Sequence, residues 1–265
     1  LFWGCSTTAN DRFGSSVAIS GHTIVVRGDN GRSACVFTRN ESEWTQQACL
    51  TISAGDVTNL PITSMAISGD TIVLATTDGA GVAHVFKPGN DQWIQSAVLN
   101  GSSAVDGDNF GASVAIDNNT IVIGAPNDIS DIGAAYIFRN TNGAWFEAAK
   151  LTASSPNQGA QFGTSVAIYG NTIAIGAPHA NGGSVYLFEY NAEGWSQQTC
   201  LENRALTEGD SFGESVAVFG DTIVIGAPGR SVDDIKSGAA YVYELNEGDW
   251  VQKASLINPN GGNDN

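Results

Sequence analysis

Acidic side chains form four close pairs along the chain, and carboxylate oxygens are the ligands with which proteins hold calcium. The pairs are Asp106 with Asp108, Asp128 with Asp131, Glu208 with Asp210, and Asp233 with Asp234. All four pairs are expected in loops, where they could coordinate calcium or act as solvated carboxylates that keep an acidic protein soluble. We favour the second interpretation. The metal ligands are therefore left unknown, with Asp106, Asp108, Asp128 and Asp131 as candidates, and no cofactor is expected.

The three histidines offer little for catalysis. His22 is expected in a turn, His84 in a strand and His179 just after a Gly-Ala-Pro phrase. None comes with a nucleophile elbow or a metal-ligand partner. No catalytic residue is therefore assigned, and the chain is predicted not to be an enzyme.

The cysteines lack the spacing of a zinc site, and they are Cys5, Cys35, Cys49 and Cys200. Their even number permits two disulfides, although no connectivity follows from it and unpaired thiols are the alternative. Cys49 and Cys200 occupy one slot of an internal repeat in which other copies carry Val, Lys or Ser. That slot is expected to be exposed, and exposed cysteines are better tolerated as disulfides in an oxidising compartment. This pattern favours an extracellular or cell-surface protein.

Two short motifs also bear on a location outside the cell. Asn-x-Ser/Thr sequons at Asn40, Asn100 and Asn118 are expected in turns or linkers, so they permit glycosylation. Arg27-Gly28-Asp29 spells an integrin-binding tripeptide, but it lies where other copies of the repeat have Gly-Ala-Pro. We interpret the tripeptide as drift in a degenerate copy.

A repeat that runs through the whole chain must position these residues. The phrase Phe-Gly-x-Ser-Val-Ala begins at Phe13, Phe110, Phe162 and Phe212, and Pro61 begins a degenerate version. The five starts lie 48, 49, 52 and 50 residues apart, a period typical of blade-type arrays. The complete repeats are expected at 11–50, 59–99, 108–151, 160–201 and 210–256, within one body of residues 1–265.

The segments outside these repeats resemble pieces of the same pattern. Residues 1–10 are interpreted as the tail of a preceding repeat, and 257–265 as a linker toward a further one. We therefore expect a longer array of the seven-bladed type, and a closed five-bladed ring is the alternative.

Each copy contains four short apolar runs separated by turn residues, which predicts a four-stranded antiparallel meander. In the third copy the runs are 113–116, 120–124, 134–138 and 145–151. Only a Gly- or Asn-led pair separates the first two runs, as a two-residue hairpin turn requires. Runs such as Thr-Ile-Val-Ile are apolar on both faces, as in strands covered on both sides. The predicted fold is all-β, a β-propeller of four-stranded antiparallel blades.

A Trp recurs in every copy, and a Leu follows six residues later. The Trp residues are Trp44, Trp93, Trp145, Trp195 and Trp250. Because an even separation places two residues on the same face of a regular strand, Trp and Leu are expected to face the same way. The Trp side chains are predicted to be packing anchors, with sugar stacking as the alternative.

The charge balance narrows the partners. The formal net charge is −16, and the few Lys and Arg form no cluster. Such a surface repels nucleic acid and anionic membranes, and no apolar run is long enough to span a bilayer. Neither nucleic-acid binding nor membrane insertion is expected.

The phrases Phe110-Gly111-Ala112-Ser113-Val114-Ala115-Ile116 and Ile123-Gly124-Ala125-Pro126 resemble the FG-GAP repeat. Three copies match well and two are degenerate. The resemblance implies a β-propeller, usually of seven blades, working outside the cell, as in the integrin α-chain head, a fungal lectin of similar build and many secreted proteins of bacteria and algae. The integrin-like form carries a calcium loop between the first two strands, whereas this chain has only tight turns there. Calcium sites therefore cannot be carried over, because calcium takes six to eight oxygen ligands.

These patterns predict a secreted or cell-surface, non-catalytic propeller for adhesion, structural assembly or protein recognition. The partners would be proteins or glycans outside the cell, and self-assembly is possible. The loops 127–133, 179–183 and 229–238 are expected to present the variable surface. One alternative is a carbohydrate-binding lectin with sites between blades, and a less favoured one is an enzyme with its site at the channel mouth.

Overall fold

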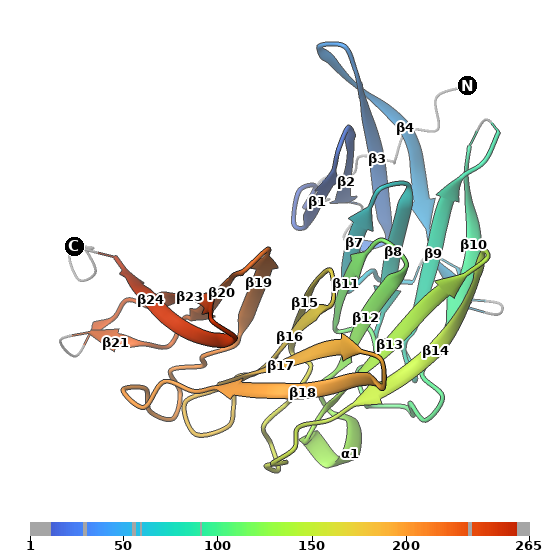
Figure 1. Cartoon of the computed structure of the whole chain (residues 1–265). Helices are drawn as coiled ribbons and strands as arrows, with labels where there is room; N and C mark the ends of the chain where they lie inside the picture. Colours follow the sequence, from blue (N-terminus) through green and yellow to red (C-terminus); the bar gives the residue numbers. More distant parts are fainter. Residues whose placement is uncertain are drawn as a thin grey trace. The chain divides into compact units, whose positions relative to one another are not determined.

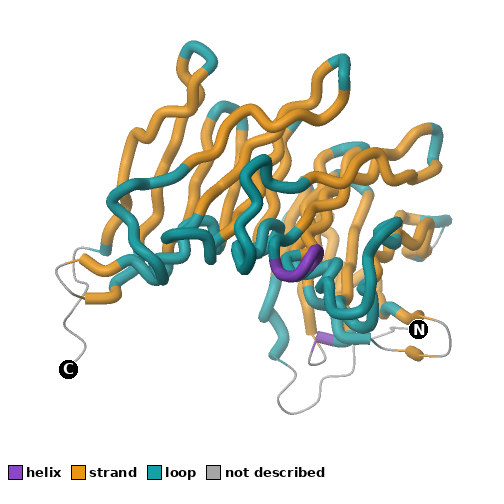
Figure 2. Tube along the Cα trace, turned by 90° about the horizontal axis from the view of Figure 1, so that it is seen from below, coloured by secondary structure: helices purple, strands orange, loops and turns teal. Residues whose placement is uncertain are grey.

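The computed structural model describes residues 12–28, 31–54, 57–58, 60–90, 92–232 and 235–258, and β-strands dominate them (Figure 1, Figure 2). This described part contains five four-stranded sheets, each a meander of consecutive antiparallel strands except where β21 and β22 interrupt the fifth. We call the sheets blades one to five. They confirm the predicted all-β propeller architecture of four-stranded antiparallel blades.

The strands fall where the apolar runs predict them. Blade one contains β1 (Val17–Ser20), β2 (Thr23–Gly28), β3 (Ser33–Asn40) and β4 (Glu43–Thr51). Blade two contains β7 (Ser64–Ser68), β8 (Thr71–Thr76), β9 (Val82–Pro88) and β10 (Trp93–Leu99). Blade three contains β11 (Ser113–Asp117), β12 (Thr120–Ala125), β13 (Ala134–Thr141) and β14 (Ala144–Leu151). Blade four contains β15 (Ser165–Tyr169), β16 (Thr172–Ala177), β17 (Ser184–Asn191) and β18 (Gly194–Leu201). Blade five contains β19 (Ser215–Phe219), β20 (Thr222–Ala227), β23 (Ala239–Asn246) and β24 (Asp249–Ile257).

The predicted two-residue turns join the first two strands of every blade. Their leading residues adopt the left-handed conformation, with φ between 51° and 58°, and are Gly21, Gly69, Asn118, Gly170 and Gly220. Gly and Asn tolerate this conformation best. Turn chemistry that is visible in the sequence therefore sets the hairpin register.

Five smaller elements lie in connections of the described residues: the hairpin of β5 (Ser53–Ala54) and β6 (Val57–Thr58), the helix α1 (Asp128–Asp131), and the hairpin of β21 (Ser231–Val232) and β22 (Ile235–Lys236). Within α1, Ile129 and Ser130 have left-handed dihedrals, so this turn is not a regular right-handed helix. No helix in the described residues has the length and apolar character to cross a membrane. The segment 1–10 and most of 257–265 lie outside the described residues.

The chain divides into two compact units, Leu1–Ile121 with Phe138–Ala148, and Val122–Ile137 with Ala149–Asn265. In the first unit, one core cluster packs Val36 and Leu50 of blade one against Leu74 and Phe86 of blade two. In the second unit, an equivalent cluster packs Leu187 of blade four against blade five. Each cluster fills the space between two neighbouring blades, so burial depends on stacking and no blade covers its own faces.

The Phe-Gly dipeptides form the joints between blades. Phe110, Phe162 and Phe212 are completely buried. Phe162 pairs with Gly133 in a parallel bridge, and Phe212 pairs with Gly183 in the same way. The phenylalanine that opens one repeat is thus wedged against the glycine that precedes the third strand of the repeat before it.

The glycine of each dipeptide is required by space and by conformation. Gly213 has φ +95°, and a Cβ there would lie 2.7 Å from the carbonyl oxygen of Ser184 in the preceding blade. Gly111 has φ +96°, and its Cβ would lie 2.8 Å from the carbonyl oxygen of Thr76. Only glycine combines a positive φ with so close a backbone approach.

The serine of the motif completes the joint. Ser64 Oγ donates to the carbonyl oxygen of Gly111 at 2.7 Å, and Ser165 Oγ donates to that of Gly213 at 2.7 Å. Each serine therefore binds the backbone of the next repeat. The repeated residue types serve the joints between blades.

The degenerate second copy corrects one sequence assignment. The sequence pattern places Pro61 where other copies have the phenylalanine, but Pro61 is exposed. Ile62 is 2% exposed, and its N–H donates to the carbonyl oxygen of Gly31. Ile62 therefore occupies the structural position of the phenylalanine, with its apolar side chain buried in the joint between the blades.

A β-bulge overturns the expected common face of Trp and Leu. The pairing of the third and fourth strands skips one residue of the fourth strand: Gln47 in blade one, Ser96 in blade two, Gln198 in blade four and Lys253 in blade five. An extra residue reverses the alternation of side chains. Accordingly Leu201 packs toward blade five, whereas Trp250 packs from blade five back toward blade four. The separation of Trp and Leu in the sequence is even, but the strand that carries them is not regular.

Candidate functional site

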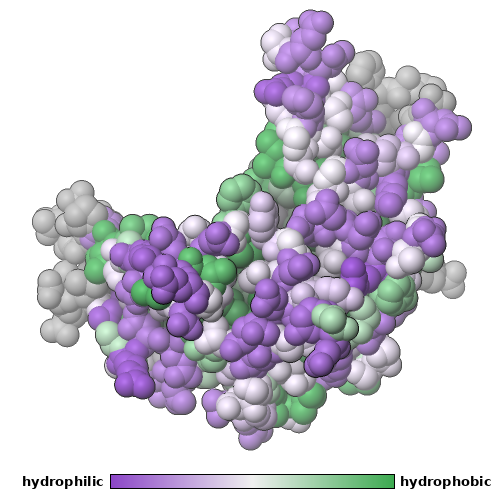
Figure 3. All heavy atoms as spheres, viewed as in Figure 1, coloured by the Kyte–Doolittle hydropathy of each residue, from purple (hydrophilic) through white to green (hydrophobic). Residues whose placement is uncertain are grey.

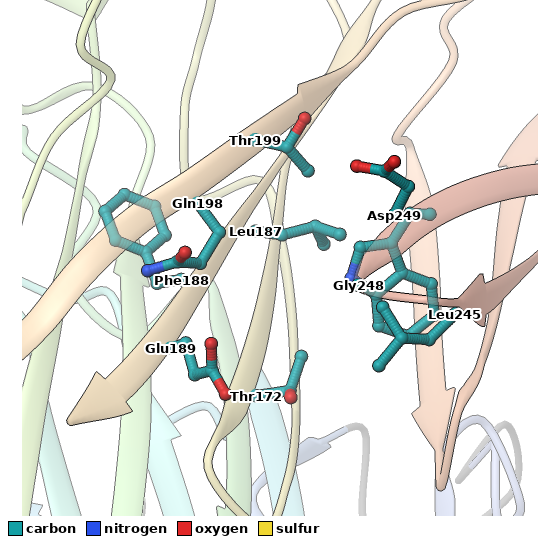
Figure 4. Close-up of a pocket in the computed structure, with 10 residues that line it drawn as sticks. Thr172, Leu187, Phe188, Glu189, Gln198, Thr199, Leu245, Gly248 and Asp249 are labelled. Atoms are coloured by element: carbon teal, nitrogen blue, oxygen red, sulfur yellow. The ribbon is translucent and has the colours of Figure 1, made fainter.

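A groove of about 520 Å³ lies between blades four and five (Figure 4). Its walls come from β16, β17 and β18 of blade four and from the β23–β24 hairpin of blade five, and include Thr172, Glu189, Gln198, Thr199, Asp249 and Trp250. Figure 4 shows Leu187 centrally, with Thr199 and Asp249 to one side of it and Glu189 and Thr172 to the other. The volume falls within the range of small-ligand sites.

The bulge of the fourth strand places one groove side chain. Gln198 is the residue that the β17–β18 register skips, and bulges re-aim side chains in this way. Its amide nitrogen donates to Ser196 Oγ at 2.9 Å. The Gln198 side chain is exposed in the groove wall, where it can donate to and accept from a ligand.

Trp250 joins the groove to the core. Its half-buried ring packs against the core cluster of blades four and five and also lines the groove. Trp93 has the same two roles in the other unit. The predicted packing role of these two side chains is confirmed, and the remainder of each ring is available to a ligand.

A second groove, of about 580 Å³, lies between blades one and two and uses the same repeat positions. Thr23 corresponds to Thr172, and Trp93 corresponds to Trp250. Gln47 is the bulge residue of blade one, and it donates to Thr45 Oγ1 at 2.8 Å as Gln198 does to Ser196. The groove is thus a feature that the repeat can build more than once.

The two grooves differ in charge. Glu189 and Asp249 line the groove of blades four and five, and the described residues give neither carboxylate a hydrogen bond. At the positions equivalent to Glu189 and Asp249, the groove of blades one and two has the uncharged Thr38 and Gln92, and its charged residues are Arg39 and Asp70. Arg39 Nη2 lies 3.1 Å from His22 Nδ1, and its guanidinium lies 5.8 Å from the centre of the Trp44 ring. The groove of blades four and five therefore has two carboxylates and no basic residue in its lining, whereas the groove of blades one and two has one of each.

The comparison with protein families decides the relationship. The model of the FG-GAP repeat matches residues 93–138, 145–188 and 195–243, which make up more than half of the chain. The chain belongs to the FG-GAP repeat family. Each match begins at a Trp of a fourth strand and ends at the aromatic residue of the next third strand, so the FG-GAP unit spans one joint between blades. A comparison with curated proteins finds no match.

Within the FG-GAP frame, the candidate calcium ligands mostly have structural partners. Asp108 is buried, and its Oδ2 accepts the Val105 N–H at 2.8 Å. Asp210 repeats this contact with the Thr207 N–H at 2.8 Å. Asp106 and Asp131 are exposed. Among the described residues, no group of three or more His, Cys, Asp or Glu side chains is arranged to hold a metal ion, and Asp233 and Asp234 lie outside them.

Asp128 is the centre of a polar cluster. It is 3% exposed; its Oδ2 accepts the Tyr136 hydroxyl at 2.7 Å and lies 2.8 Å from Lys150 Nζ. Lys150 also lies 5.0 Å from the centre of the Tyr136 ring. Burial opposes the charge of Lys150, but hydrogen bonds and attraction to Asp128 and Tyr136 outweigh it and raise its pKa. The cluster ties the 127–133 loop to the sheet.

Cys49 of blade one and Cys200 of blade four occupy the same repeat position as Lys150 of blade three. Cys35 and Cys49 are register partners and both are disulfide-bonded. Cys200 carries a free thiol. The one other cysteine of the chain, Cys5, could form a disulfide with only one of the two, so the disulfide joins Cys35 to Cys49. The structure therefore does not place Cys200 in a disulfide. Cys5 lies outside the described residues.

Cys200 and His84 are both shielded from water. Burial, with a smaller effect of Glu202, raises the pKa of the Cys200 thiol to about 11. Burial lowers the pKa of His84, opposed by a hydrogen bond between its Nδ1 and Gln95 Oε1 at 2.8 Å. Cys49, Lys150 and Cys200 are half-buried in this slot, whereas Val98 and Ser255 in the same slot are exposed. The expectation of an exposed slot therefore holds in two of the five blades.

The remaining motif residues lie at the surface or in joints. Asn40, Asn100 and Asn118 are exposed, as a glycan would require. Arg27 donates to Ser15 Oγ at 3.0 Å and to the carbonyl oxygen of Ile62 at 2.9 Å. Arg27 is thus engaged in the joint between blades one and two, while Asp29 of the tripeptide lies outside the described residues.

Sequence reasoning missed the polar residues of the grooves, Gln47, Gln198, Glu189 and Asp249. Nothing in their types distinguishes them from other surface residues. The one sequence feature that points to the grooves is the recurring Trp, which predicts where a groove lies but not which polar residues line it.

Proposed function

We propose that this FG-GAP chain is a non-catalytic recognition module that acts outside the cell in adhesion or assembly. The motif residues are engaged in joints between blades, which leaves grooves and loops for a partner. The observation that carries the proposal is the recurrence of one groove at the same repeat positions in both units. Repeated sites raise avidity when a partner presents several copies of one epitope.

The variable loops support a recognition role. Three consecutive residues of the 127–133 loop, Ile129, Ser130 and Asp131, have φ of 54°, 59° and 65°. A β-branched residue in this region is strained, and such strain often accompanies binding function. The Asp128 cluster holds this loop in place, and the 229–238 loop carries its own small hairpin of β21 and β22. Both loops therefore have defined conformations, unlike simple irregular connections.

The location outside the cell is tested on the natively produced chain. We expect peptide mapping under non-reducing conditions to find the Cys35–Cys49 disulfide, because such bonds persist in oxidising compartments. Mapping with an N-glycosidase should find glycan at one or more of Asn40, Asn100 and Asn118 if the producing cell glycosylates its secreted proteins. Free thiols at both Cys35 and Cys49 would count against this location.

Glycan binding is the second candidate function, and the groove of blades four and five favours it. Trp250 offers an apolar ring face, while Glu189, Gln198 and Asp249 offer polar groups around the same space. Sugars present an apolar face and a rim of hydroxyl groups, which this combination of ring and polar side chains can bind.

A glycan array followed by titration calorimetry with the best-bound glycan tests this candidate. Gln198→Ala and Asp249→Asn alter exposed side chains, so both variants should fold and should weaken binding about tenfold or more, which corresponds to about 1.4 kcal/mol. Trp44→Ala is the matched control, because Trp44 is 40% exposed and lines neither groove. An array without specific binding, or equal loss in the control, would reject the glycan proposal and leave protein recognition.

A further inference from the structure

The two grooves share one apolar frame. In blade five, Leu245 is the register partner of Trp250, and both residues line the groove of blades four and five. In blade two, Pro88 and Trp93 are paired in the same way and line the groove of blades one and two. Register partners lie side by side on one face of a sheet, so each hairpin presents an apolar wall to its groove. A difference in ligand between the grooves must therefore come from their polar residues.

Charge separates the two grooves. The hairpin ends that flank the groove of blades four and five are residues 189–194 and 244–249. They contain no basic residue and five carboxylates, namely Glu189, Glu193, Glu244, Glu247 and Asp249. The corresponding segments of blades one and two, 38–43 and 87–92, contain three carboxylates and two basic residues. Because charges of one sign add up in a cleft, the groove of blades four and five has much the stronger negative potential.

Glu189 and Asp249 lie apart in this groove. Figure 4 shows them on opposite sides of Leu187, which forms the floor. Both carboxylates are exposed, whereas Leu187 is 1% exposed and Leu245 is 39% exposed. A metal ion needs several ligands that converge on one point, and here an apolar side chain lies between the two carboxylates. The arrangement suits a ligand that combines cationic groups with apolar segments.

Lysine and arginine side chains have this combination. Their aliphatic stems pack on apolar surface, and their charged ends form strong hydrogen bonds with carboxylates. The half-buried ring of Trp250 adds cation–π attraction, and the Gln198 carboxamide in the groove wall can bond a peptide group. A polypeptide contains both peptide groups and basic side chains, whereas a polyamine contains only cationic groups and methylenes. The lining therefore matches a polypeptide with basic side chains.

We propose that the groove of blades four and five binds basic side chains of a polypeptide partner. Glu189 and Asp249 pair with the cationic groups, and Leu245 and Trp250 contact the aliphatic stems. This inference rests on the recognition function proposed above and names the chemistry of the partner. Hydrophilic residues predominate on the face seen in Figure 3, and the formal net charge of the chain is −16. Such a surface attracts a basic partner before contact.

The groove of blades one and two rejects the same partner. Thr38 and Gln92 replace the two carboxylates, and the lining includes Arg39. A neighbouring arginine repels a basic side chain, and repulsion of this kind gives specificity. One chain thus contains a groove that binds basic side chains and, on the same apolar frame, a natural control.

Titration calorimetry with a set of blocked peptides tests the proposal. The probes are acetylated and amidated peptides, identical except for two positions that carry Arg, Lys, Gln or Glu. The arginine peptide should bind most tightly, because guanidinium pairs with carboxylate through two hydrogen bonds and stacks on aromatic rings. The lysine peptide should follow, and the glutamine and glutamate peptides should not bind. Raising sodium chloride should weaken binding, because it screens the charges.

Variants of the two carboxylates show where the peptides bind. Glu189→Gln and Asp249→Asn change exposed side chains, so both variants should fold. Each should weaken binding of the arginine peptide about tenfold or more, because each removes a charge-assisted hydrogen bond. Glu193→Gln is the matched control, because it removes the same charge from the same hairpin and Glu193 does not line the groove. Its effect should be less than about twofold.

A transplant of charge tests sufficiency. The triple variant Thr38→Glu, Arg39→Gln and Gln92→Asp gives the groove of blades one and two the carboxylates of the other groove. It should bind two arginine peptides per chain where the wild type binds one. A ratio that stays at one, with an unchanged thermal melt, would contradict the claim that these positions select the ligand.

The remaining outcomes separate this inference from the recognition function. Failure of the wild type to bind the arginine and lysine peptides, or equal weakening by Glu193→Gln, would overturn the inference. Spermidine that binds as tightly as the arginine peptide would overturn the assignment to a polypeptide. If a neutral glycan binds and the peptides do not, the inference fails and the recognition function stands. If neither peptides nor glycans bind, the result counts against the recognition function as well.

Discussion

Replacing the joint glycine Gly213 by alanine tests how the blades are held together. Gly213 has φ +95°, and a Cβ would lie 2.7 Å from the carbonyl oxygen of Ser184 and 3.1 Å from a methyl group of Val185. Gly209 is the matched control, because it lies in the same connection with φ +89° and a Cβ there would meet no atom within 4 Å. The two substitutions share the conformational effect and differ in the steric one.

The magnitude follows from these two effects. An alanine at positive φ costs about 1–2 kcal/mol at either position. Overpacking against fixed neighbours adds about 1–3 kcal/mol at Gly213 alone, because the atom it meets is backbone and cannot rotate away. We therefore expect Gly209→Ala to lower the free energy of unfolding by about 1–2 kcal/mol, and Gly213→Ala by about 2–5 kcal/mol.

Urea unfolding followed by tryptophan fluorescence measures both values. A change in midpoint at constant slope would show that stability itself has changed. If the two variants unfold at the same urea concentration, the Phe-Gly glycine is needed only for its dihedral angle, and the close backbone approach at the joint does not require it.

Three further predictions concern the slot between the third and fourth strands. Lys150→Met should lower stability by about 2 kcal/mol, below the range for fully buried pairs because Lys150 is partly exposed. The pKa of Lys150 is raised in the folded protein, so the stability that Lys150 contributes is fully present below its unfolded pKa of 10.5 and is lost as the pH rises through its folded pKa. Thermal melts of Lys150→Met and wild type should therefore converge at strongly alkaline pH. A difference that stays constant with pH would contradict this. Reduction of the Cys35–Cys49 bond, which closes a loop of about fifteen residues, should lower stability by about 3 kcal/mol, and Cys49→Ser should abolish the effect of the reductant. Cys200, with a pKa of about 11 against an ordinary 9.0, should react with a disulfide reagent at pH 8 about a hundredfold more slowly in the folded protein than in urea; equal rates would show an accessible thiolate.

The strands and turns of the blades could be predicted from the local sequence. Turn pairs led by Gly21 or Asn118 require positive φ, and the apolar runs between them are long enough for one strand each. These are properties of neighbouring residues, so sequence alone locates them within one to three residues. The Phe-Gly repeat likewise indicated the period, the number of complete repeats in the chain and the family.

The face on which a side chain lies was harder to predict. A count of residues from Trp250 to Leu256 is even and suggests a common face, but the bulge at Lys253 reverses the alternation. A bulge depends on how two strands pair, and no local propensity of Lys, Ser or Gln predicts it. The same bulge brings Gln198 into the groove of blades four and five, so the groove could not be predicted either.

What the sequence by itself determined was therefore the element: five copies of a four-stranded meander, with glycines where the backbone needs positive φ and phenylalanines at a fixed place in each copy. Only the tertiary structure decided what those residues meet. The phenylalanine reads as a core residue in any alignment of the copies, yet its partners are a glycine and a carbonyl about thirty residues earlier in the chain. Contacts of that range depend on how blades stack, and local sequence does not determine stacking.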